Sequence, residues 1–219
     1  MSSIGVFSLS PLKSDCLLER SLHGTNDVEL NILYKNKTVG LCEYYNNVLN
    51  DKTNEKYRYI IFCHHDISLR YANLNHSLED GLKSYDIIGV AGGREPTIKD
   101  KNLWHWMMEP SSYRGIAAHS SGRGNMLMTS FGPFPDRVAI LDGVFLAFEF
   151  NKIHNSGARF DNNFKWHHYD IDFSLTCNKH KLRLGVWPIF LYHESPGLRD
   201  INDIEWNRSN EYFKQKWSV

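Results

Sequence analysis

The first 92 residues alternate between short apolar runs and stretches in which apolar side chains recur at helical spacing. The apolar and alternating runs predict strands at 3–9, 27–36, 57–63 and 86–92. The stretches between them predict helices at 15–24, 39–50 and 73–85. This regular exchange of strands and helices predicts an α/β fold in which helices flank a mostly parallel central sheet.

The second half of the chain is less regular. From about residue 92 to residue 137 it is rich in Gly, Ser, Pro, Trp and Met and has little periodicity. Such a segment is typical either of a partly mobile cover over a site or of a surface excursion with short strands, and the sequence leaves both open. The later patterns predict a strand at 138–150 interrupted at Asp142-Gly143, a loop running into a helix at 166–180, two short strands within 182–195, and an amphipathic helix at 203–217.

Composition and charge exclude several classes of protein. The chain has 25 Lys and Arg residues against 25 Asp and Glu residues, so it has no net charge that would attract nucleic acid. It has neither an apolar stretch that could span a membrane nor a recognisable signal peptide. Its four cysteines are scattered, which favours reduced thiols. We expect one domain over residues 1–219, alone or as part of a longer enzyme, that is cytoplasmic or peripheral to a membrane.

Three clusters of imidazole and carboxylate side chains lie where predicted elements begin or end. Residues 64–66 (HHD) follow the strand at 57–63, residues 166–172 (WHHYDID) lead into a helix, and residues 193–195 (HES) follow a strand. Because ligands bind beyond the carboxyl ends of strands in such sheets, the clusters are candidates for one site. Mixed oxygen and nitrogen ligands suit a divalent ion such as Mn²⁺. Taken singly, each cluster fits an ordinary role as well, as a cap, a polar surface or acids at a helix start.

Four stretches, FCHHDI, LDGVFLAF, FKWHHYDIDFSL and VWPIFLYHES, stand in the order and spacing of a known family. In these motifs the chain resembles the family-2-like glycosyltransferases with the GT-A fold, and the resemblance covers roughly residues 3–195. It implies a hexosyltransferase that moves a sugar from a UDP-, GDP- or dTDP-sugar to a hydroxyl of a glycan or glycolipid, with inversion. It also implies Mn²⁺ or Mg²⁺ as the cofactor.

The resemblance assigns roles to particular residues. Asp66 matches the last carboxylate of the family's Asp-x-Asp motif and would hold the metal ion with His193, while Asp170 matches the catalytic base of inverting members. His64 stands where the family has its first aspartate, and its imidazole could ligate the metal or contact the ribose. The residues assigned to the nucleotide and donor are Phe7, Ser8, Asn46, His64, His65, Asp142 and Gly143. Those assigned to the acceptor are Trp166, His167, His168 and Asp172.

Two other classes of protein fit the same residues. A metal-dependent hydrolase or nucleotidyltransferase could use the His/Asp cluster, although such enzymes usually need more ligands than Asp66 and His193 to hold a metal-bound water. A non-catalytic, glycan-binding domain of glycosyltransferase type would account for the missing first aspartate. These classes are distinguished by whether nucleotide, metal or glycan binds.

Overall fold

The computed structural model describes residues 3–34, 39–69, 73–120, 125–195 and 203–218. Its α-helices are α1 (Leu17–Leu22), α2 (Leu41–Asn50), α3 (Leu74–Ser84), α4 (Phe150–Ser156), α5 (Tyr169–Lys179) and α6 (Ile204–Trp217). Short 3₁₀ helices lie at Lys52–Lys56 (η1) and Pro110–Ser112 (η2). The helices predicted at 39–50, 73–85, 166–180 and 203–217 are thus present, with ends shifted by a few residues.

The larger of two sheets contains, in spatial order, β2 (Val28–Tyr34), β1 (Ile4–Ser10), β3 (Tyr59–Cys63), β11 (Phe145–Glu149), β5 (Ile87–Gly89), β12 (Leu184–Val186) and β9 (Asp136–Val138). As predicted, β1 pairs in parallel with β2 and β3, and β12 pairs in parallel with β5. In contrast, β11 runs antiparallel between β3 and β5, and β9 runs antiparallel to β12. The sheet is therefore mixed rather than mostly parallel, because the chain re-enters it from the opposite direction at β11.

The segment from residue 92 to residue 137 contributes to a second sheet. This sheet has the order β10 (Ile140–Leu141), β6 (Ala91–Gly93), β7 (Tyr113–Ser120), β13 (Tyr192–His193) and β4 (Ile67–Ser68), with β8 (Met126–Gly132) paired to β7. Short strands are thus the alternative found in the described part of this segment, which leaves out residues 121–124.

The predicted strand at 86–92 is divided, because β5 and β6 belong to different sheets. Gly115 of β7 allows that strand to lie close to the junction of β5 and β6: its φ is +103°, and a Cβ there would lie 2.0 Å from the Val90 carbonyl oxygen.

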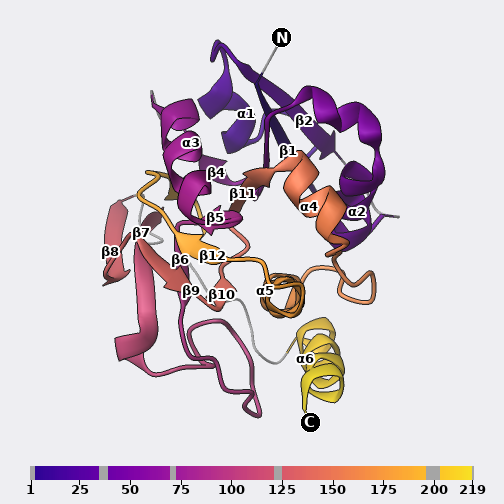
Figure 1. Cartoon of the computed structure of the whole chain (residues 1–219), viewed down its shortest axis with the longest axis vertical. Coiled ribbons are helices and arrows are strands. Elements are labelled where there is room, and N and C mark those ends of the chain that lie inside the picture. The colour runs from indigo at the N-terminus through magenta and orange to yellow at the C-terminus, as the bar shows by residue number, and fades with distance from the viewer. Residues whose placement is uncertain (1–2, 35–38, 70–72, 121–124, 196–202, 219) are drawn as a thin grey trace.

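Helices cover the larger sheet and tie it to the second (Figure 1). α3 packs on β5 and β11, α2 packs on β1, and α4 packs on β11 beside α2. α5 packs on β10 and β12, and α6 lies next to α5 at the C-terminal end of the chain. This arrangement brings together the ends of β3 and β13 and the start of α5, which carry the predicted polar clusters.

The hydrophobic core is centred on β3, all five residues of which are buried. Phe62 of β3 stacks on Tyr45 of α2 with ring centroids 4.0 Å apart, and Phe160 stacks on Phe173 of α5 at 3.8 Å. These ring pairs fix α2 and α5 against the sheet. The four cysteines are free and buried, as predicted from their spacing. Among the described residues, the helices are all too short or too polar to cross a bilayer.

A buried ion pair fastens α6 to α5. Asp172 is fully buried, its Oδ1 lies 2.8 Å from Lys216 Nζ, and the same oxygen accepts a hydrogen bond from Trp217 Nε1 at 2.8 Å. Lys216 Nζ also lies 2.7 Å from Asp161 Oδ2. One lysine of the last helical turn thus contacts two carboxylates, one of which is fully buried.

We expect Lys216→Met to destabilise the protein by about 3–5 kcal/mol, because it leaves the Asp172 carboxylate buried without its cation. Urea unfolding followed by tryptophan fluorescence would measure the loss. Lys214→Met is the matched control, because Lys214 pairs with the exposed carboxylates of Asp100 and Glu211 and should cost at most about 1 kcal/mol. Equal losses for the two variants would contradict this account of how α6 is held.

Candidate active site

The polar residues after β3 meet a histidine from far along the chain. β4 pairs antiparallel with β13, which places Ile67 opposite His193 and brings His193 beside Asp66. His193 Nε2 lies 3.3 Å from Asp66 Oδ1 and 3.4 Å from His64 Nδ1. One ligand atom from each of these three side chains lies within 4.8 Å of the others. The predicted pair Asp66–His193 is therefore brought together, and His64 joins it. His65 is partly exposed beside them.

The chemistry of this cluster fits a divalent cation. Asp66 Oδ1 is buried and makes no hydrogen bond, although His193 Nε2 lies close to it. Burial raises the pKa of Asp66, but the adjacent His193 imidazole outweighs burial and is the main cause that lowers this pKa well below its ordinary value. The carboxylate is therefore ionised at neutral pH. An ionised carboxylate beside two imidazoles offers the mixed oxygen and nitrogen ligands that a divalent cation accepts.

The contact of His64 Nε2 with Tyr169 determines which of the two ring nitrogens of His64 carries the proton. Tyr169 Oη donates to the Gly143 carbonyl at 3.1 Å and lies 3.0 Å from His64 Nε2. Because a hydroxyl has only one proton, we assign the proton of the second contact to His64 Nε2, which donates to Tyr169. Burial, followed by the charge of His193, lowers the pKa of His64, so the imidazole is neutral. Its Nδ1 lone pair then faces Asp66 and His193, the arrangement that outer partners impose on metal-binding histidines.

Asp170, the predicted base, lies in the first turn of α5 beside the Asp142-Gly143 turn. It is partly exposed, and its Oδ2 accepts a hydrogen bond from the Gly143 amide at 3.1 Å. Burial and the charge of Asp142 raise the pKa of Asp170 to about 7. Asp142 is itself held by Trp104 Nε1, which donates to its Oδ2 at 2.7 Å. Glycine is required at position 143, because a Cβ there would lie 2.2 Å from Tyr169 Oη.

Sequence reasoning missed Tyr169. Its hydroxyl contacts both His64 and the Gly143 carbonyl, so this one residue connects the cation cluster to the turn that contacts Asp170. The only signal in the sequence was its position immediately before Asp170. Tyr169 is buried, and an aromatic residue at the start of a helix is more often core than part of a site.

Three residues predicted to bind the donor lie instead in the core. Phe7 is 5% exposed and packs among aromatic rings. Ser8 is fully buried and donates to the Cys63 carbonyl at 2.8 Å. Asn46 donates through Nδ2 to the Phe160 carbonyl at 2.8 Å. Burial and internal hydrogen bonds already occupy these three side chains, so their donor contacts stay predictions.

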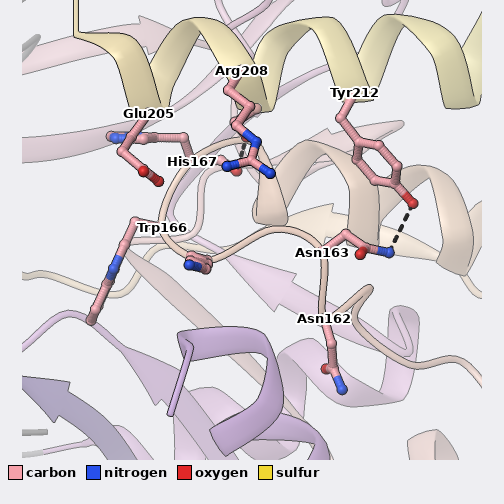
Figure 2. A pocket seen from close by; sticks show the side chains of 9 residues that line it. Asn162, Asn163, Trp166, His167, Glu205, Arg208 and Tyr212 are labelled. Atoms are coloured by element: carbon pink, nitrogen blue, oxygen red, sulfur yellow. Dashed lines mark hydrogen bonds between the residues drawn. The ribbon is translucent and has the colours of Figure 1, made fainter. Parts of the chain in front are cut away.

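The predicted acceptor residues fall into two groups. Trp166 and His167 line a pocket next to α6 (Figure 2). His168 is 3% exposed, and its Nδ1 lies 2.9 Å from Ser209 Oγ of α6. Asp172 is enclosed by the ion pair described above. The side chains of His168 and Asp172 face α6 rather than solvent, so their acceptor contacts stay predictions.

The mixed sheet flanked by helices matches the fold of GT-A glycosyltransferases. The family model described as "Glycosyltransferase like family" matches residues 12–217, and the chain therefore belongs to that family. The predicted family and fold are confirmed. None of the curated proteins compared with the chain matches it.

Two solved structures illustrate the shared fold. GalNAc-T7, crystallised with UDP, GalNAc and Mn²⁺, has a TM-score of 0.59 at 9% identity, covering 98% of this chain and 48% of that one. TarS of S. aureus, in complex with UDP-GlcNAc, has a TM-score of 0.51 at 10% identity, covering 90% of this chain and 60% of that one. At these identities the likeness extends to the fold alone, and the chain spans only about half to three-fifths of these neighbours.

Proposed function

We propose that this glycosyltransferase moves a hexosyl group from a nucleoside-diphosphate sugar to a hydroxyl of a glycan or glycolipid, with inversion at the anomeric carbon. One observation carries the proposal: His64, Asp66 and His193 converge beyond β3 and are joined through Tyr169 to the turn that contacts Asp170. The neighbours with this fold were solved with UDP or UDP-GlcNAc, so UDP-sugars are the first donors to test.

His64, Asp66 and His193 are the residues that would hold the cation. Two imidazole nitrogens and one carboxylate favour a borderline ion such as Mn²⁺ over Mg²⁺, which prefers oxygen ligands. A divalent ion bound there would supply positive charge against the departing nucleoside diphosphate. Tyr169 keeps His64 in the tautomer whose Nδ1 can act as a ligand.

Asp170 acts on the acceptor. Its carboxylate accepts the proton of the acceptor hydroxyl while the hydroxyl oxygen forms a bond to the anomeric carbon. The bond from that carbon to the diphosphate oxygen breaks, and the diphosphate leaves with the electron pair. A positioned base of this kind contributes about 10²–10⁴-fold to the rate. The Gly143 amide orients the carboxylate through Oδ2.

Because Asp170 must be ionised to accept a proton, we expect the transfer rate to rise with pH through a midpoint of about 7. Asp142→Asn removes the charge that helps to raise this pKa, so the midpoint should move to lower pH. The measurement is kcat/KM between pH 5 and 9 for the two proteins, because kcat/KM reports the pKa values of the protein without substrate. An unmoved midpoint in Asp142→Asn would contradict the electrostatic coupling of these carboxyls.

Thermal melting with UDP, GDP and dTDP, each with and without Mn²⁺, tests the proposed function. A ligand at 100 times its dissociation constant stabilises the native state by about 2.7 kcal/mol, a Tm increase of roughly 5–10 °C for a chain of this size. We expect one nucleotide to give this increase only when Mn²⁺ is present. An increase with Mn²⁺ that no nucleotide enlarges would favour a metal-dependent hydrolase, and no increase under any condition would contradict the proposal.

A further inference from the structure

β8 is an edge strand that the proposed reaction makes no use of. It pairs with β7 on one side and with no other strand of the described chain on the other, and Figure 1 shows it at the outer margin of the molecule. The antiparallel ladder is regular from Met126 to Ser130 and shifts register beyond Ser130. Because alternate residues of an edge strand point their backbone N–H and C=O groups away from the neighbouring strand, this stretch presents a row of unpaired donors and acceptors.

The side chains at the start of this strand are apolar and exposed. Met126, Leu127 and Met128 are 59%, 54% and 46% exposed. Neighbouring residues of a strand point to opposite faces of the sheet, so both faces of β8 are open at this end. No charged residue occurs from residue 125 to residue 134. An edge strand that is apolar, uncharged and exposed is a template for pairing with a strand of another chain.

The other sheet edges among the described residues are protected. β2, the outer strand of the larger sheet, is half-buried along its whole length and carries Glu29, which pairs with Lys56 at 3.0 Å. β9, at the opposite margin of that sheet, has only three residues, two of them charged. β4 and β10, which end the second sheet, have two residues each. Short length and charge are the usual means by which proteins prevent strand pairing between chains, and β8 has neither.

We propose that β8 pairs antiparallel with β8 of a second copy of this chain across a two-fold axis, so that the second sheets of the two copies become one. The second copy supplies an edge of the same length, and the stretch from Met126 to Ser130 brings no like charges together. A lipid bilayer would also accept the apolar side chains, but hydrocarbon leaves the N–H and C=O groups of an open sheet edge without partners. The unpaired edge therefore favours a strand over a lipid.

The proposed interface lies near the cation cluster without forming part of it. His119 of β7 lies opposite Leu127 of β8 on one side and opposite His193 of β13 on the other. Neighbouring strands are about 4.8 Å apart, so the β8 backbone of the second copy would lie roughly 14 Å from that of His193. We therefore expect nucleotide and Mn²⁺ to bind equally to monomer and dimer, and the inference does not rest on the proposed function.

Sedimentation velocity on the full chain tests the interface. The wild type should change from the 25.5 kDa monomer to a dimer as its concentration rises from about 1 to about 100 μM. The double variant Met126→Lys/Met128→Lys should weaken this association roughly tenfold or more, because it places ammonium groups on both facing edges. Leu12→Lys/Ile204→Lys is the matched control, because it makes the same charge change at two exposed apolar residues outside the second sheet. This control should associate like the wild type.

Amide hydrogen exchange on the wild type locates the interface without any variant. Residues 126–130 should exchange more slowly at the higher concentration, because pairing protects the amides that point away from β7. A monomer at every concentration, a dimer with unchanged exchange in β8, or a Met126→Lys/Met128→Lys dimer as tight as the wild type would each overturn the proposal. So would a monomer that sediments with phosphatidylcholine–phosphatidylglycerol vesicles through β8, which would assign the strand to lipid. The melting shift with nucleotide and Mn²⁺, measured separately, decides the transferase.

Discussion

Asp170→Asn should lower the transfer rate by about 10²–10⁴-fold and leave the nucleotide-dependent melting shift intact. The asparagine amide can still accept the hydrogen bond from the Gly143 amide, so the local geometry survives while the proton acceptor is lost. The measurement is kcat for transfer together with the melting shift. Asp100→Asn is the control, because the Asp100 side chain is 89% exposed and Asp100 is not one of the proposed site residues. Turnover within about twofold of the wild type would remove Asp170 as the base.

The same substitution should stabilise the protein above neutral pH. The pKa of Asp170 is about 7 in the folded chain, above the ordinary value of 3.8. The folded state therefore binds a proton more tightly than the unfolded state, and stability falls as the pH rises from about 4 to about 7. Asparagine cannot ionise, so the Tm of the variant should exceed that of the wild type at pH 8 and approach it at pH 4. A gain in stability with a loss of rate would mark Asp170 as a site residue rather than a core residue.

Asp66→Ala should abolish the melting shift that nucleotide and Mn²⁺ produce together, because it removes the only carboxylate of the cation cluster. Losing an outer partner of a metal ligand typically costs 10–100-fold in affinity, and losing a ligand should cost at least as much. We expect the same result for His193→Ala and a smaller loss for Tyr169→Phe, which removes the partner of His64 Nε2. Nucleotide titrations at fixed Mn²⁺ would measure each loss.

A second His/Asp pair provides the control for this series. His76 and Asp80 form an exposed pair on α3, with Nε2 and Oδ2 3.2 Å apart. Asp80→Ala should leave the melting shift unchanged, because an exposed pair of two ligands cannot replace the three converging side chains. A normal Mn²⁺-dependent shift in Asp66→Ala would show that the cation binds elsewhere.

The fold could be predicted from sequence as far as local pattern determines it. The runs around β1 and β3 and the periodic stretches of α3, α5 and α6 indicated their structures correctly. The place and direction of β11 could not be predicted, because strand order within a sheet depends on long-range pairing that leaves no local signal. The second sheet was obscured for the same reason, since strands such as β4 and β13 have only two residues each.

The site could be predicted in part. Strand ends and motif resemblance indicated Asp66, His193 and Asp170 as candidates, and the structure brings Asp66 and His193 together, but neither kind of signal gives the direction of a side chain. Ser8 points into the core although it lies on the strand that ends near the site. Asp172 follows Asp170 by two residues on α5, and positions two apart do not share a helix face. One therefore contacts the Gly143 turn while the other faces α6.

Diffraction data collected at the manganese absorption edge, from crystals grown with Mn²⁺ and the nucleoside diphosphate that gives the melting shift, test the central claim most directly. We predict an anomalous peak bonded to Asp66 and His193, next to the diphosphate, with Asp170 on the opposite side of the space left for the sugar. A peak at another set of residues, or a diphosphate bound away from His64, Asp66 and His193 with no manganese between them, would contradict the account.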